Sequence, residues 1–487
     1  MSTSADPHLQ DHPPTESLLL VDGSALKLKH LVREVPGKRL VYQASWQGQP
    51  VFAKVFLGKL ALKYAQRDLS GIQKLLDARS MTPQILSYQA TADGANQVLI
   101  LEEIVGAKNM EQVLQAWPAC SKQRQQLASQ LVKEVAKHHH AGLHQTDIYF
   151  KNFLLLEDQI FTLDGDGIKM LPKHNEGQTT LRNLAALLSK LDVLEIEKWL
   201  PQLLADYGHA RGWQTLPPLA LLQHLIAVHR RQATNAYANK KVFRTCTDVQ
   251  VSKQSNQYLA VASAYTNIDL GNVSLLDNCL QIPDFKSGNT CTVGLLTTKD
   301  AQKIVIKRYN VKSVWHGVMR SFRKTRAAIS WANAHRLKLL GLATIQPVSL
   351  LEERFFFGRL RRRSYFLSEY LDGLDADDFF AAERDKVKRA EVVKHIVELF
   401  YRLYLLNISH GDMKASNIKI VDNQPVLIDL DSMKQHSFGL IAKHSHARDL
   451  RRFMRNWQAD EALTNAFKKV FKVVYTDHQP LKLAHIE

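Results

Sequence analysis

The sequence has few of the features that mark secreted, metal-binding or membrane-spanning proteins. It contains four cysteines, too few for a disulfide framework, and none of them form a CxxC motif. It has no run of about eighteen or more apolar residues, so we expect no membrane span. The first residues lack the basic stretch and apolar core of a secretory signal. These absences predict a protein of the reducing cytosol.

Positive charge is in excess. Lys and Arg number 64 against 47 Asp and Glu, which gives a formal net charge of +17. A surplus of this size predicts an anionic partner, which could be nucleic acid, an acidic membrane face or a phosphorylated substrate. The hydrophobic fraction of 45% is enough for buried cores, and a chain of 487 residues favours about two to four domains.

The strongest chemical pattern lies in residues 410–431. It begins with HGDMKASN, continues through two strand-like runs joined by a turn, and ends with LIDLD. Asp412 and Asn417 are five residues apart, and Asp429 follows Asp412 by seventeen. Phosphoryl transfer from Mg-ATP requires a carboxylate that accepts the proton of the acceptor hydroxyl, and an Asn and a second carboxylate that hold the metal. Because a hairpin folds Asp429 back beside Asn417, the segment predicts a catalytic loop of protein-kinase type.

The same spacing occurs earlier in the chain. In the run HQTDIYFKN at 144–152, Asp147 precedes Asn152 by five residues, and Asp164 follows Asp147 by seventeen. Two accidental matches would not share both intervals. The sequence therefore predicts an internal duplication.

Each copy also carries a lysine upstream of its motif. Lys54 and Lys307 both lie in strand-like runs. In a kinase-like amino-terminal lobe such a lysine contacts the α- and β-phosphates of ATP. A helix predicted over residues 60–78 carries Asp68, which we expect to be the acidic partner of Lys54.

The two copies differ around these lysines. The second copy has Gly288, within KSGNTCTVG at 286–294, in the hairpin expected to cover ATP, whereas the first copy has only Gly37 in that turn. Residues 327–350 of the second copy contain no carboxylate. The acidic partner of Lys307 is therefore missing or supplied differently.

The predicted fold class is α+β, with two tandem protein-kinase-like bilobal domains. Each would have an amino-terminal lobe built on an antiparallel sheet and a mainly helical carboxy-terminal lobe. The expected order is a flexible tail, a first kinase-like domain, a polar connecting segment, and a second domain with a short carboxy-terminal lobe, over residues 1–17, 18–235, 236–280 and 281–487.

A helix predicted over residues 122–140 ends in three adjacent histidines, His138 to His140. Adjacent residues on a helix point about 100° apart, so the three cannot converge on one metal ion. We expect them instead to interact with the carbonyls and the dipole at the helix end.

Together the motifs resemble the bacterial lipopolysaccharide core heptose kinase and Kdo kinase superfamily. The likeness covers both halves, and the first copy is closer to the heptose kinases. Where protein kinases have Asp-Phe-Gly, this chain has IDLD in its second copy. The similar segments are PGKR at 36–39, DIYFKNFL at 147–154, RLKLLG at 336–341, HGDMKASN at 410–417 and IDLD at 428–431.

The resemblance implies ATP-dependent phosphorylation of heptose or Kdo hydroxyls of the lipopolysaccharide inner core, at the cytoplasmic face of the inner membrane. The implied partner is the core oligosaccharide or a lipid A-linked precursor, with no nucleic acid. Carried over to this chain, the resemblance implies that the catalytic bases are Asp147 and Asp412. It implies that the metal ligands are Asn152, Asp164, Asn417 and Asp429. The lysines that contact the phosphates would be Lys54 and Lys307.

Two basic runs agree with this interpretation, at 359–363 and 451–455. They could meet phosphorylated sugars or the anionic surface of the inner membrane, where each charge contributes about 1 kcal/mol. The alternative is that they are solvated surface without a dedicated partner.

Two other functions stay open from the sequence. Lys414, two residues after Asp412, resembles the lysine of Ser/Thr protein kinases, although no Ala-Pro-Glu signature follows either metal-binding Asp. A tandem kinase and pseudokinase, with one copy as a regulatory binding module, would explain the poor glycine turn of the first copy and the missing acidic partner in the second.

Overall fold

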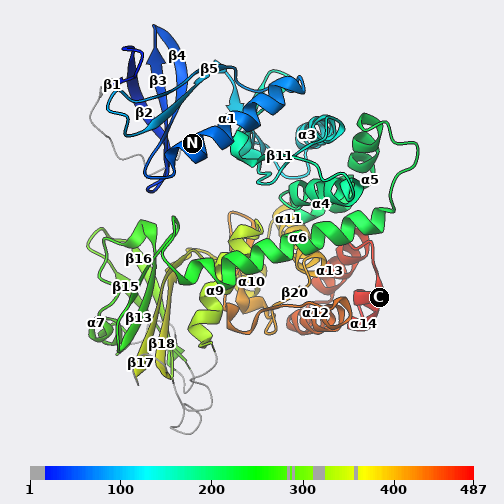
Figure 1. Cartoon of the computed structure of the whole chain (residues 1–487). Coiled ribbons are helices and arrows are strands. Elements are labelled where there is room, and N and C mark those ends of the chain that lie inside the picture. Colours follow the sequence, from blue (N-terminus) through cyan, green and yellow to red (C-terminus); the bar gives the residue numbers. More distant parts are fainter. Residues whose placement is uncertain (1–16, 282–285, 288–290, 311–323, 356–359, 487) are drawn as a thin grey trace. The chain divides into compact units, whose positions relative to one another are not determined.

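The structure is a computed structural model of the chain (Figure 1). It describes residues 17–281, 286–287, 291–310, 324–355 and 360–486. The tail predicted for residues 1–17 lies outside the described residues, except for Ser17. By its internal contacts the chain divides into two compact units, Met1–Arg230 and Arg231–Glu487. Helices and antiparallel sheets occur in both, which confirms the α+β class.

The sheet of unit 1 has the strand order β1-β2-β3-β4-β6-β5, with antiparallel pairing throughout. Alternation along β4 sends Val51, Ala53 and Val55 into a core on one face. Phe56 belongs to the core on the other face, which helix α1 (Ala61–Asp77) covers. The strands are β1 (Ser17–Leu19), β2 (Ala25–Val35), β3 (Arg39–Trp46), β4 (Gln49–Phe56), β5 (Ile85–Ala90) and β6 (Gln97–Glu102).

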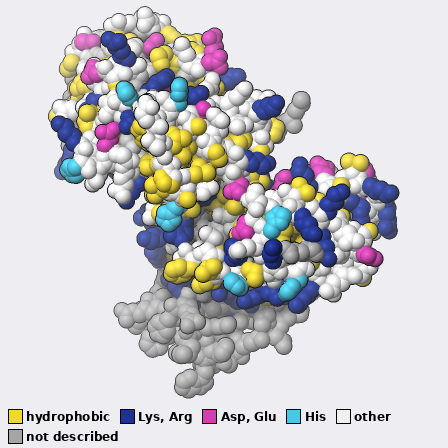
Figure 2. Space-filling model, turned by 90° about the vertical axis from the view of Figure 1, so that its right-hand side faces the viewer, with side chains coloured by type: hydrophobic (Ala, Val, Ile, Leu, Met, Phe, Trp, Pro, Cys, Tyr) yellow, Lys and Arg dark blue, Asp and Glu magenta, His cyan; other side chains and the backbone are white. Residues whose placement is uncertain are grey.

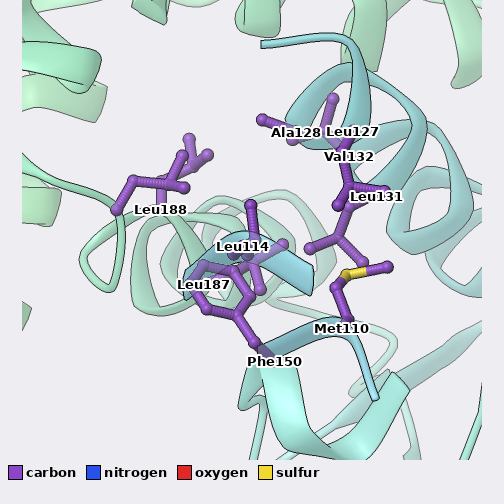
Figure 3. A pocket seen from close by; sticks show the side chains of 10 residues that line it. Met110, Leu114, Leu127, Ala128, Leu131, Val132, Phe150, Leu187 and Leu188 are labelled. Atoms are coloured by element: carbon purple, nitrogen blue, oxygen red, sulfur yellow. The ribbon is translucent and has the colours of Figure 1, made fainter. Parts of the chain in front are cut away.

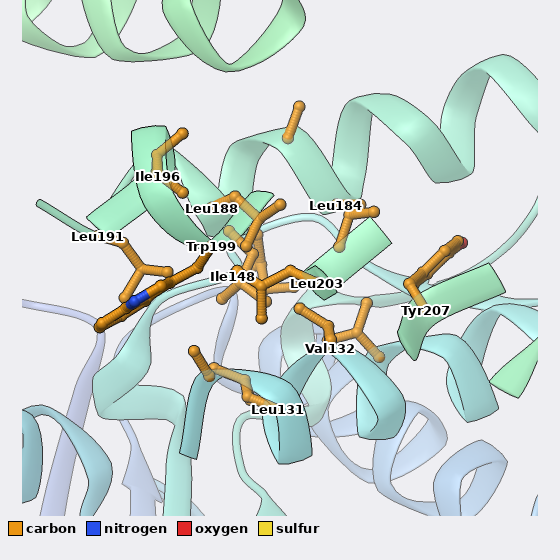
Figure 4. Packing of buried hydrophobic residues seen from close by; sticks show 14 of the residues in the cluster. Leu131, Val132, Ile148, Leu184, Leu188, Leu191, Ile196, Trp199, Leu203 and Tyr207 are labelled. Atoms are coloured by element: carbon orange, nitrogen blue, oxygen red, sulfur yellow. The ribbon is translucent and has the colours of Figure 1, made fainter. Parts of the chain in front are cut away.

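The rest of unit 1 is mainly helical. Side chains from α3, α4 and α5 point toward one another in its core, among them Leu131, Leu184 and Leu203 (Figure 4). Two small sheets, β10-β9-β7 and β11-β8, lie within this part. The elements are β7 (Lys108–Asn109), α2 (Met110–Ala116), α3 (Lys122–His140), β8 (Leu143–Gln145), η1 (Phe150–Asn152), β9 (Phe153–Leu156), β10 (Gln159–Thr162), η2 (Gly165–Gly167), β11 (Ile168–Met170), α4 (Glu176–Leu188) and α5 (Val193–Ala210). Helix α6 (Leu219–Asn239) begins in unit 1 and continues past Arg230 into unit 2.

A small cavity lies in this helical core, lined only by apolar side chains such as Met110, Leu114 and Phe150 (Figure 3). Its volume of about 10 Å³ is at the lower limit for a single water molecule. An apolar void of this size is a packing defect, and it offers no site for a ligand.

The sheet of unit 2 has the strand order β12-β13-β17-β18-β16-β15-β14, again antiparallel. Helix α9 packs against it as α1 packs in unit 1. The elements are β12 (Val249–Lys253), β13 (Gln257–Ala262), η4 (Ser263–Tyr265), α7 (Val273–Asn278), β14 (Lys286–Ser287), β15 (Cys291–Thr297), β16 (Lys303–Tyr309), α9 (Arg326–Leu339), β17 (Pro347–Phe355) and β18 (Leu360–Glu369).

Residues 236–280, expected to form a polar connection, differ from that expectation. Strands β12 and β13 belong to the sheet of unit 2, because β13 pairs with β17. This pairing buries Tyr258 and Ala260. The strands are short and lie among polar residues, so they did not stand out in the sequence. The first residues of the segment complete helix α6.

The helical part of unit 2 repeats the order of elements in unit 1. Its core is rich in aromatic rings, including Phe400, Phe453 and Phe467. The elements are β19 (Leu374–Asp375), α10 (Ala376–Ala382), α11 (Lys386–Leu405), β20 (Ile408–Ser409), η5 (Ala415–Asn417), β21 (Ile418–Val421), β22 (Gln424–Leu427), η6 (Leu430–Ser432), β23 (Lys434–Gln435), α12 (Gly439–Met454), η7 (Arg455–Trp457), α13 (Glu461–Val474) and α14 (Gln479–Ala484). Within the described residues, no helix combines the length and the apolar character needed to cross a membrane.

The histidines at the end of α3 correct one prediction. His138 and His139 are buried and bond to side chains instead of to the helix-end carbonyls. The ring of His139 lies 2.7 Å from the hydroxyl of Tyr207 and 3.0 Å from Oδ1 of Asn183. Burial lowers the pKa of His139 to about 3, so this ring is neutral and gains nothing from the helix dipole.

Candidate functional site

In unit 1 the predicted catalytic loop lies between β8 and β9. The side-chain amide of Asn152 donates to the carbonyl oxygen of Asp147 at 2.8 Å. The backbone N–H of Leu163 donates to the carbonyl of Asn152, also at 2.8 Å. The hairpin of β9 and β10 thus returns Asp164 to the side of Asn152, as the sequence spacing predicts.

Unit 2 repeats these contacts at the matching positions. The amide of Asn417 donates to the carbonyl of Asp412 at 2.6 Å, and the N–H of Ile428 donates to the carbonyl of Asn417 at 3.1 Å. The next residue, Asp429, has a left-handed backbone with φ of 56°, and Asp164 in unit 1 has φ of 67°. A left-handed conformation is uncommon for residues other than glycine, and such strain gathers at functional sites.

One residue of each loop has a role that the sequence did not assign. The side-chain amide of Gln145 donates to the carbonyl of Leu163 at 2.9 Å, and Nε2 of His410 lies 2.9 Å from the carbonyl of Ile428. Because a carbonyl only accepts, Nε2 of His410 carries the proton. Gln145 therefore occupies the place of His410 in unit 1. Gln145 precedes Asp147 by two residues, as His410 precedes Asp412, and this spacing would have identified it.

A second set of polar contacts joins each catalytic loop to a helix that follows it in the chain. Asp449 of α12 accepts from the backbone N–H groups of His410, at 2.6 Å, and Gly411, at 3.0 Å. In unit 1, Asn183 of α4 donates instead to the carbonyl of Gln145 at 2.8 Å. Burial raises the pKa of Asp449. No local spacing in the sequence connects these residues with the loops, so only the fold reveals them.

The lysine of unit 1 has the acidic partner that the sequence predicts. Nζ of Lys54 lies 2.9 Å from each carboxylate oxygen of the fully buried Asp68. Nη1 of Arg39 lies 3.0 Å from Asp68 and 3.4 Å from Oδ1 of Asp164. Burial acts to raise the pKa of Asp164, but the charges of Lys54 and Arg39 outweigh it and hold this pKa below its usual value. The strand lysine, the helix carboxylate and the second aspartate of the motif thus form one cluster.

Two glycines allow helix α1 to approach the second motif. A Cβ atom on Gly71 would lie 1.8 Å from the carbonyl oxygen of Gly165, and one on Gly165 would lie 2.2 Å from the carbonyl oxygen of Asp68. Close backbone contact therefore fixes Asp68 next to the motif. In unit 2 the residue after Asp429 is Leu430, and the side chain of Asn333 in α9 donates to its carbonyl at 2.9 Å.

The lysine of unit 2 has carboxylate partners from a different element. Nζ of Lys307 lies 2.6 Å from Asp429 and 3.4 Å from Asp431, and Arg326 of α9 lies 2.8 Å from Asp431. Burial acts to lower the pKa of Lys307, but Tyr309 and these carboxylates outweigh it and raise this pKa. The sequence indicated that the helix lacks an acidic partner, and the motif itself supplies one.

The proposed base of unit 2 is also paired with cations. Asp412 forms an ion pair with Arg452 of α12, and Nζ of Lys414 lies 3.5 Å from its other oxygen.

Of the two glycines expected near ATP in unit 2, the structure describes only Gly294. Gly288 lies outside the described residues. Gly294 lies within β15, where a Cβ atom would come 2.7 Å from the carbonyl oxygen of Cys279. Gly294 therefore permits close packing on the residue that follows α7.

The side chains present in both units fit a magnesium nucleotide. Carboxylate and amide oxygens, which Asp164 and Asn152 offer in unit 1, are the ligands that Mg²⁺ prefers. The lowered pKa of Asp164 keeps it ionised at neutral pH. Lys54 supplies positive charge for phosphates in the same cluster.

Comparison with known proteins gives one family match. The model of the lipopolysaccharide kinase (Kdo/WaaP) family matches residues 47–171 and 282–475, which is more than half of the chain. A solved structure, WaaP in complex with acyl carrier protein, is similar over 42% of this chain and 88% of that chain, with 19% identity and a TM-score of 0.32. No curated protein matches the chain.

Proposed function

Because the chain belongs to the lipopolysaccharide kinase (Kdo/WaaP) family, it is an ATP-dependent kinase, and we propose that it phosphorylates a heptose or Kdo hydroxyl of the lipopolysaccharide inner core. The observation that carries the proposal is the cluster of Lys54, Asp68 and Asp164 beside the loop of Asp147 and Asn152. Each member has the charge or hydrogen-bonding capacity that phosphoryl transfer requires.

We assign the same roles in both units. Asp147 and Asp412 accept the proton of the sugar hydroxyl while its oxygen bonds to the γ-phosphorus and ADP leaves. The metal ligands are Asn152, Asp164, Asn417 and Asp429, and Lys54 and Lys307 contact the phosphates. Mg²⁺ held by these side chains would supply positive charge to the phosphates.

Each unit is proposed to be a protein-kinase-like bilobal domain, with the boundary between Arg230 and Arg231. The support is the repeated order of elements, a sheet with its lysine strand followed by a helix and then a helical part with the catalytic loop.

We further propose that the protein binds its sugar acceptor at an anionic membrane surface. Helix α12 carries the exposed Arg451 in its last turn, and the exposed Arg455 follows at the start of η7. At the start of α12, Phe438, Leu440 and Ile441 are 71%, 74% and 54% exposed. A helix that exposes apolar side chains at one end and basic side chains toward the other can contact both the apolar and the anionic parts of a bilayer surface. Lys and Arg side chains are also spread over much of the face in Figure 2.

A second candidate role concerns unit 2 alone. Lys307 is paired with the proposed metal ligand Asp429, and Arg452 with the proposed base Asp412. Cations on both carboxylates favour a copy that binds nucleotide and regulates unit 1 without transferring phosphate.

The test uses the full-length protein, Mg-ATP and vesicles that contain inner-core glycolipid. Mass spectrometry is expected to find one added phosphate on heptose or on Kdo, which also identifies the sugar. Vesicles rich in anionic lipid should support faster transfer than zwitterionic vesicles. Phosphate on protein instead of glycolipid would contradict the proposal, and equal rates on both vesicles would contradict the membrane contact.

A further inference from the structure

The two units place different residues at one position beside the proposed nucleotide site. On β3, Arg39 lies opposite the residue two positions after Lys54. On β15, Cys291 lies opposite the residue two positions after Lys307. Arg39 and Cys291 therefore match, and the cation of unit 1 has no counterpart on the equivalent strand.

Unit 2 obtains its second cation from a helix. Arg326 of α9 lies 2.8 Å from Asp431, next to Lys307. In unit 1 the helix contributes the carboxylate of Asp68 and the strand contributes Arg39. Both units thus combine one lysine and one arginine with the aspartates of the motif, although the arginines come from different elements.

The turn that would cover the phosphates in unit 1 has few free donors. Pro36 has no N–H, and the N–H of Lys38 donates to the carbonyl of Val35 at 3.0 Å. Only the N–H of Gly37 remains in the turn. A glycine-rich loop binds phosphates through several backbone N–H groups, so this turn needs help from a side chain.

The position of Arg39 suits it to bind phosphate. Its side chain is 11% exposed, and Nη1 lies 3.4 Å from Asp164, the carboxylate proposed to hold the metal. Its Nε is buried and has no hydrogen-bond acceptor within the described part of the chain. The guanidinium group carries donors in a planar fork that matches phosphate oxygens.

We propose, on the basis of the proposed function, that Arg39 binds the terminal phosphates of the nucleotide in unit 1, in place of a glycine-rich loop. Arg39 releases Asp164 to the metal and turns its free donors to the phosphates. Its contribution is therefore specific to nucleotides that carry these phosphates.

The test measures nucleotide affinity by calorimetry on the full-length protein. All variants carry Lys307→Ala, which is expected to weaken nucleotide binding in unit 2, so that the measured affinity reports on unit 1. Arg39→Gln is expected to weaken ATP binding about ten- to hundredfold, since a hydrogen bond to a charged group is lost. The affinity for AMP should stay within about twofold, because AMP lacks the terminal phosphates. Lys29→Gln, on the exposed surface of β2, is the matched control and should change neither affinity.

Arg39 also touches Asp68, so an indirect effect through Lys54 must be separated from direct binding. In a Lys54→Met background, Arg39→Gln should still weaken ATP binding, because the arginine contacts phosphate itself. No further loss in that background, or equal losses for ATP and AMP, would overturn the proposal. If Arg39→Gln does not fold, Arg39→Lys is measured in the same way. Failure of sugar phosphorylation with this binding pattern intact would reject the proposed function alone.

Discussion

Replacing both Asp147 and Asp412 with Asn lowers the rate of phosphoryl transfer by about 100- to 10,000-fold, the range for loss of a general base. Asn keeps the size of the side chain but cannot accept the proton. We expect Asp147→Asn alone to account for most of the loss. In unit 1, Lys54 forms an ion pair with the helix carboxylate Asp68, whereas in unit 2 Lys307 is paired with the proposed metal ligand Asp429. The rate is measured as phosphate transferred to glycolipid under single-turnover conditions.

Two exposed carboxylates serve as controls for this experiment. Asp158 and Asp422 lie in the turns of the hairpins that follow the two catalytic loops. Their Asn variants should keep the rate of the unaltered protein. Full activity in the double variant of Asp147 and Asp412 would remove both residues from the chemistry. A large loss from Asp412→Asn alone would remove the regulatory role considered for unit 2.

Replacing Asp68 with Ala lowers the free energy of unfolding of unit 1 by about 3 to 5 kcal/mol, as expected when one member of a buried ion cluster is removed. The change leaves Lys54 and Arg39 without their shared carboxylate. Both side chains are only 11% exposed, so water solvates their charges poorly. Urea denaturation, followed with a probe in unit 1, measures the shift.

Asp77→Ala is the control for Asp68→Ala, because Asp77 lies on the exposed end of the same helix. Its effect should stay within about 0.5 kcal/mol. A loss below about 1 kcal/mol for Asp68→Ala would mean that the cluster contributes little to the fold of unit 1.

The sequence allowed the local parts of each site to be predicted. The interval between Asp412 and Asn417, and the hairpin that returns Asp429, depend on contacts within about twenty residues. Turn chemistry and alternation determine such contacts, so a spacing rule is enough. The pairing of Lys54 with Asp68 was also within reach, because a strand leads directly into the helix.

Contacts between distant segments could not be predicted in this way. Asp449 reaches the loop of His410 only because α12 packs beneath it. The pairing of Lys307 with Asp429 and Asp431 joins segments more than a hundred residues apart. Likewise, β13 became recognisable as part of the second sheet only through its pairing with β17.

The number of nucleotides bound per chain tests the central claim most directly, since that claim is a pair of sites, each with a lysine strand facing an acidic loop. Equilibrium dialysis with Mg-ATP should find two bound nucleotides per full-length chain. Lys54→Met and Lys307→Met should each remove one of the two. Binding that neither variant reduces would contradict the account.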